Sequence, residues 1–153
     1  DTFMDFISEL FHNQILISAI TAWLTAQVLK TLIHMWLTRS FTPERMVGSG
    51  GMPSSHSATV CGLATATWLI SGPGSFEFAI SVIFAIVVMH DAIGVRRETG
   101  IQAKVLNQMI TLFEDMGSDM SAQDKLKEFV GHTPLQVLIG ALLGIGVALA
   151  ICL

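Results

Sequence analysis

The chain has 153 residues, enough for one domain, and a net charge of -4 that argues against a nucleic-acid partner. Hydrophobic residues make up 52% of it and charged residues only 13%, against about 25% in soluble domains. With a mean hydropathy of +0.63, this composition indicates an integral membrane protein. The two cysteines, Cys61 and Cys152, lie in apolar runs without the spacing of a zinc site or a disulfide framework.

Apolar runs predict an all-α bundle with about four transmembrane helices, in a single membrane domain over residues 1–153. The expected spans are about 15–37, 54–70, 76–91 and 134–153. The polar segment 94–133 joins the last two, and its first part has apolar residues at helical spacing. This pattern predicts an amphipathic helix at the membrane surface or packed beside it. In the last span, Gly140 and Gly144 form a small-residue face that we expect to pack within the monomer.

A glycine- and serine-rich turn lies between the first two spans. Its glycines permit backbone N–H groups to converge on one point, and its serines add hydroxyl donors. A helix that begins here would direct its positive end toward a bound phosphate. From these residues alone, an anion-binding turn and a hairpin that binds nothing are equally open. The candidates in the turn are Gly50, Gly51, Ser54, Ser55 and His56.

The order of the spans predicts that other polar motifs gather on the same face as this turn. The third span returns to it with Asp91, Arg96 and Arg97, and the fourth begins there at His132. All eight Lys and Arg residues lie on this face or in the half-span nearest it. The positive-inside rule therefore predicts a multi-pass protein of the cell membrane with this face in the cytoplasm and both termini outside.

These residue types suit phosphoryl transfer. Cations and N–H donors stabilise the charge on the phosphoryl oxygens. One histidine can attack phosphorus while another protonates the leaving oxygen, so the scheme requires no metal and no cofactor.

Three blocks carry a family resemblance: residues 50–58 (GGMPSSHSA), 91–107 (DAxGVRRxxGxQAxxLN) and 131–134 (GHTP). Together they resemble the divergent branch of the type 2 phosphatidic acid phosphatase superfamily, which is related to acid phosphatases and vanadium haloperoxidases. The resemblance implies a membrane phosphatase that hydrolyses a lipid phosphate monoester or pyrophosphate through a phosphohistidine. The alternative on the same scaffold is a non-catalytic binder or transporter of phospholipid or polyprenyl phosphate. Since the superfamily's membrane members have six spans, a homodimer would complete the bundle.

The resemblance also implies roles for single residues. His56 would protonate the leaving group and His132 would be the nucleophile, with Arg96 or Arg97 on the phosphate. The other phosphate-binding candidates are Lys30, Arg39, Gly50, Gly51, Ser54 and Ser55.

Two features depart from the superfamily pattern. Lys30 and Arg39 have eight residues between them where the pattern has six, and no proline follows Arg39. Gln136 stands where the pattern has an aspartate that orients the nucleophilic histidine. Three interpretations are open: turnover is weak, Asp91 is the orienting acid, or Gln136 is an engineered change.

Overall fold

The computed structural model describes residues 2–41, 51–119, 126 and 131–153. The described residues form helices and no strand, which confirms the predicted all-helical fold. The helices are α1 (Thr2–His12), α2 (Gln14–Thr38), α3 (Ser55–Ser71), α4 (Phe76–Ile93), α5 (Val95–Asp115) and α6 (Pro134–Cys152).

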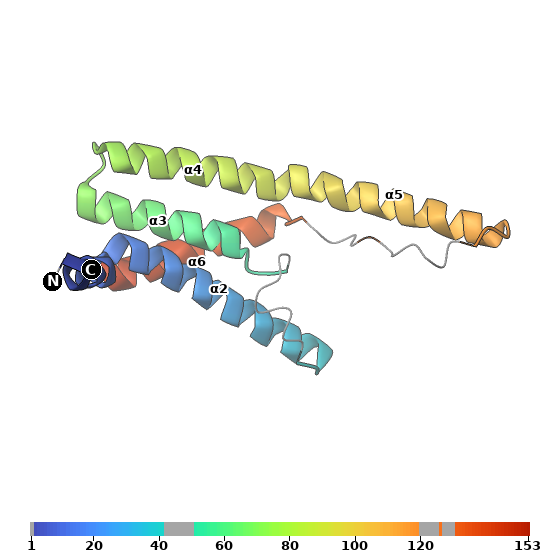
Figure 1. Cartoon of the computed structure of the whole chain (residues 1–153), viewed down its shortest axis with the longest axis horizontal. Helices are drawn as coiled ribbons and strands as arrows, with labels where there is room; N and C mark the ends of the chain where they lie inside the picture. Colours follow the sequence, from blue (N-terminus) through green and yellow to red (C-terminus); the bar gives the residue numbers. More distant parts are fainter. Residues whose placement is uncertain (1, 42–50, 120–125, 127–130) are drawn as a thin grey trace.

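Helix α3 lies at the centre of the bundle and packs against α2, α4 and α6. Successive helices of the bundle run in opposite directions, so the two chain termini lie at one end (Figure 1). The opposite end of the bundle holds the starts of α3 and α6 and the end of α4 (Figure 1). Helix α5 continues α4 beyond the bundle, with Gly94 between them (Figure 1).

Three stretches are long and apolar enough to cross a membrane: α2, the α4–α5 rod over Phe76–Asp115, and α6. Helix α3 has 17 residues and is slightly shorter than these. Because it is enclosed by the other three, the four helices together agree with the expected bundle of about four spans.

Side-chain caps set where the helices begin. The Ser54 hydroxyl accepts a hydrogen bond from the Ser57 N–H at the start of α3. Thr133 caps α6 in the same way, and Gln136 completes a reciprocal capping box. These caps place His56 in the first turn of α3 and His132 just before α6.

Two glycines allow α6 to lie directly against the backbone of α3. A methyl group at Gly140 would overlap the Ser54 carbonyl oxygen, and one at Gly144 would overlap the Ala58 carbonyl oxygen. A methyl group at Gly146 would meet no neighbouring atom within 4 Å. The small-residue face at Gly140 and Gly144 is therefore used inside the chain.

We predict that Gly144→Ala lowers the free energy of unfolding by about 1–3 kcal/mol, because the added methyl group forces α6 away from α3. Gly146→Ala in the same helix is the matched control and is expected to leave stability unchanged or slightly raised. Thermal unfolding in detergent measures both. Equal effects of the two substitutions would contradict the close α3–α6 contact.

Candidate functional site

Two histidines face each other where α3 and α6 begin, His56 half-buried and His132 buried. The ring centroids of His56 and His132 lie 6.0 Å apart with an angle of 60° between the ring planes. His132 is only 1% exposed. Among the described residues, no hydrogen-bond partner reaches His56 Nδ1 or His132 Nε2. Each ring thus has one buried nitrogen that no described residue contacts through a hydrogen bond.

Backbone hydrogen bonds fix the chain on either side of this pair. The His132 N–H donates to the Ala92 carbonyl at 3.1 Å, which ties the start of α6 to the end of α4. The Ser54 N–H donates to the Gln136 carbonyl, also at 3.1 Å. The positions of the two rings therefore depend on three helices.

Gln136 holds the ring of His132. Its Oε1 lies 3.3 Å from His132 Nδ1 and accepts the Thr133 N–H at 3.0 Å. The bond from an N–H identifies this atom of the amide as the oxygen, and an amide oxygen only accepts. His132 Nδ1 must then carry the hydrogen, which leaves a lone pair on Nε2 in the neutral ring.

Burial keeps His132 neutral. Removal from water lowers the pKa of His132 below the usual 6.5, and the hydrogen bond that Nδ1 donates to the Gln136 oxygen opposes this only partly. The positive charges of Lys30 and Arg96 lower the pKa further. At neutral pH the ring is therefore an uncharged base with Nε2 directed away from Gln136.

Lys30 brings a buried cation to the same place. It lies on α2, is 2% exposed, and its Nζ lies 3.4 Å from the Ser55 hydroxyl. Ser54 is committed to the helix cap, since its oxygen also accepts from the Ser57 hydroxyl at 3.1 Å. Of the two candidate serines, Ser55 is the one in contact with the cation.

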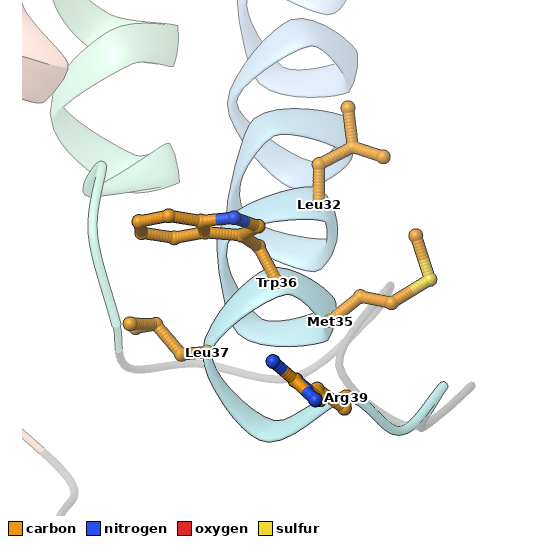
Figure 2. Close-up of a pocket in the computed structure, with 5 residues that line it drawn as sticks. All are labelled: Leu32, Met35, Trp36, Leu37 and Arg39. Atoms are coloured by element: carbon orange, nitrogen blue, oxygen red, sulfur yellow. The ribbon is translucent and has the colours of Figure 1, made fainter.

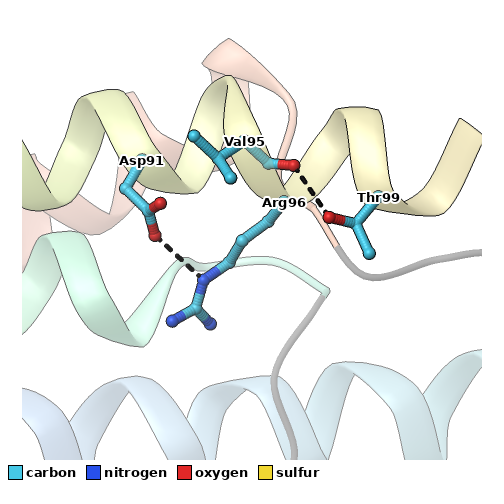
Figure 3. Close-up of polar contacts among 4 residues, drawn as sticks. All are labelled: Asp91, Val95, Arg96 and Thr99. Atoms are coloured by element: carbon cyan, nitrogen blue, oxygen red, sulfur yellow. Dashed lines mark hydrogen bonds and ion pairs between the residues drawn. The ribbon is translucent and has the colours of Figure 1, made fainter.

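Arg96 adds a second cation, and Asp91 pairs with it. The Arg96 Nε lies 3.1 Å from Asp91 Oδ2. Figure 3 shows the guanidinium directed away from the α4–α5 rod. Its charge acts on His132, whereas the neighbouring Arg97 is exposed. The structure thus places Gln136 beside the nucleophile candidate and Asp91 beside Arg96.

Three candidates remain: Arg39, Gly51 and Gly50. Arg39 follows Lys30 by nine residues, which places it about 14 Å further along α2 and about 180° around it. The structure therefore does not bring Arg39 to the histidine pair. Gly51 has a positive φ of 82°, a conformation that suits glycine. Gly50 lies outside the described residues.

Two polar residues near the candidates were not predicted as site residues. Thr133 shares the Gln136 oxygen with His132, and the pattern Thr-x-x-Gln at 133–136 is a readable capping-box signal. Gln27 lies one turn before Lys30, is 5% exposed, and its Oε1 has no partner among the described residues. A buried amide in a span signals a polar interior.

Taken together, these features define a small multi-pass membrane protein with a histidine pair and cations at one end of its helices. The chain belongs to the divergent PAP2 family, whose sequence model matches residues 11–147. The predicted family is thereby confirmed. The chain is also similar to the "Uncharacterized membrane protein YuiD" of Bacillus subtilis (strain 168), with 40% identity over 146 residues, 90% of this chain and 92% of the relative. No solved structure matches it.

We predict that His132 titrates with a midpoint below 6.5 and that Gln136→Glu raises this midpoint. A carboxylate in contact with Nδ1 stabilises the charged ring more than the amide oxygen does, because it carries a full negative charge. NMR of histidine-labelled protein in detergent measures the titration, with His132→Ala used to assign the signal. A midpoint above 6.5 in the unaltered protein would count against the buried, cation-flanked position.

Proposed function

We propose that the protein hydrolyses a phosphorylated lipid, either a phosphate monoester or a pyrophosphate, through a phosphohistidine. The observation that carries this proposal is the His56–His132 pair, in which one nitrogen of each ring has no partner within the described part of the chain. A nucleophile and a general acid must both reach one phosphoryl group, and rings 6.0 Å apart can contact opposite sides of it.

The first chemical step uses the lone pair of His132 Nε2. It attacks phosphorus while the bond from phosphorus to the lipid oxygen breaks, and His56 gives a proton to that oxygen. Water then attacks the phosphohistidine, His56 takes up one of its protons, and inorganic phosphate leaves. Each step uses groups of this chain, water and the substrate.

The surrounding charges suit the transition state. Lys30 and Arg96 are the cations that act on His132, and the Ser55 hydroxyl adds a donor beside Lys30. Such groups stabilise the charge on the equatorial phosphoryl oxygens. We propose that Arg96, with its guanidinium already oriented by Asp91, binds the phosphate rather than Arg97.

A phosphate-release screen over lipid phosphates in detergent tests this function. We predict that His132→Ala abolishes release and that His56→Ala lowers the rate by about 10²–10⁴-fold, the usual contribution of a general acid. Gln136→Glu is expected to raise the rate, because it stabilises the positive charge that develops on His132. His12→Ala is the control, since His12 is exposed on α1 and bonds only to the Ser8 carbonyl in the described structure.

A second function has one observation in its favour. Gln136 is neutral, so the nucleophile lacks the full negative charge that would stabilise its charged form. A protein that binds or transports a lipid phosphate without cleaving it would need the same cations and no such charge. Binding of the lipid with no release of phosphate, unaltered by Gln136→Glu, would favour this function.

We further propose that the site lies at the cytoplasmic side of the cell membrane and the two termini lie outside. The support is the distribution of Lys and Arg along the chain. In a Cys152→Ser background, Ser118→Cys should react with an impermeant maleimide only after the cells are opened; reaction in intact cells would reverse the orientation.

A homodimer that completes the bundle is tested by the mass of the detergent-solubilised protein.

A further inference from the structure

An exposed apolar stripe runs along the end of α2, where the histidine site does not use it. Leu32, Met35, Trp36 and Arg39 follow the spacing i, i+3, i+4, i+7, which places them along one helix face. Together with Leu37 they line a pocket of about 670 Å³ (Figure 2). Trp36 is 81% exposed. The stripe ends in a single cation, Arg39.

This stripe lies on the opposite side of α2 from the histidine site. Leu32 and Arg39 are two and nine residues beyond Lys30, which at about 100° per residue turns both of them far from its direction. Lys30 is buried against α3, whereas the stripe is open. Leu37, seven residues beyond Lys30, returns toward the direction of Lys30 but lies about 10 Å further along the helix, so the pocket is still separate from the site already described.

Arg39 has an unusual backbone for an arginine. It caps α2 in the left-handed conformation, with a φ of 52°, and is the one non-glycine residue with a positive φ among the described residues. Helices commonly end on glycine in this conformation, because other side chains meet steric hindrance there. The positive charge of Arg39 suits a helix C-terminus, but its backbone carries a conformational cost that glycine would avoid.

We propose that this pocket binds an anionic phospholipid of the bilayer, with Arg39 on its phosphate and the apolar stripe along its chains. Helix α2 is long and apolar enough to span, and Trp36 with Arg39 stands at its end, where tryptophan and arginine prefer the membrane–water boundary. A guanidinium pairs with phosphate through parallel hydrogen bonds. A headgroup that carries an ammonium would repel it, so the pocket prefers anionic lipids.

Quenching of Trp36 fluorescence by brominated lipids tests this proposal. Trp23→Phe and Trp68→Phe leave Trp36 as the only tryptophan of the chain. In mixed vesicles, brominated phosphatidylglycerol should compete for the pocket about fivefold better than brominated phosphatidylcholine, the ratio expected for one arginine near an anionic lipid. The readout does not involve phosphate release, so it is independent of the proposed phosphatase.

Arg39→Gly is the informative variant. It removes the cation and relieves the left-handed backbone, so the protein should melt at the same or a higher temperature. The preference for brominated phosphatidylglycerol over brominated phosphatidylcholine should fall from about fivefold to about one. Lys104→Gln, which removes an exposed cation on α5, is the matched control and should keep the fivefold ratio. Equal quenching by both lipids in the parent, or an unchanged ratio in Arg39→Gly, overturns the proposal. Absence of quenching by either lipid would mean that protein, such as a second copy of the chain, covers the stripe, and would overturn it as well.

Discussion

The direct contact between the backbones of α3 and α6 positions the histidine pair. Gly140 lies against the Ser54 carbonyl, and the Ser54 N–H donates to the Gln136 carbonyl, so the first turns of both helices share one contact. His56 and His132 stand at these first turns. Any side chain at Gly140 would separate the helices and, with them, the two rings. The glycines of a span thus determine the geometry of a polar site at its end.

The site that results is rich in donors and cations. Lys30 and Arg96 lower the pKa of His132 through their charge, and burial acts in the same direction. The nearby carboxylate, Asp91, pairs with Arg96. Gln136 orients His132 without giving it negative charge, so the proposed nucleophile is a neutral imidazole. An anion between the rings would complement this arrangement, because a buried cation is stabilised by an opposite charge close to it.

Much of this arrangement can be predicted from the sequence. Long apolar runs give the helices, and their alternating direction brings Asp91, Arg96 and His132 toward the turn at Ser54. Other parts depend on details that periodicity does not contain. The carbonyl that accepts the His132 N–H belongs to Ala92, an apolar residue with no sequence signal. The resemblance placed Gln136 beside the ring of His132, but its second bond, with the Thr133 N–H, needed the capping box to be recognised. The position of Arg39 needed its distance from Lys30 to be converted into a helical angle. A residue seven positions after Lys30 would lie on nearly the same face of the helix, whereas Arg39, nine positions after it, lies on the opposite face.

The central claim is that His132 and His56 act on one phosphoryl group, and it can be tested without knowledge of the lipid. A phosphohistidine that forms reversibly from inorganic phosphate exchanges phosphate oxygens with water. We therefore expect the purified protein in detergent to wash ¹⁸O out of labelled inorganic phosphate, and His132→Ala to lose this exchange completely. Exchange that persists in His132→Ala, or that is absent from the unaltered protein, would contradict the account.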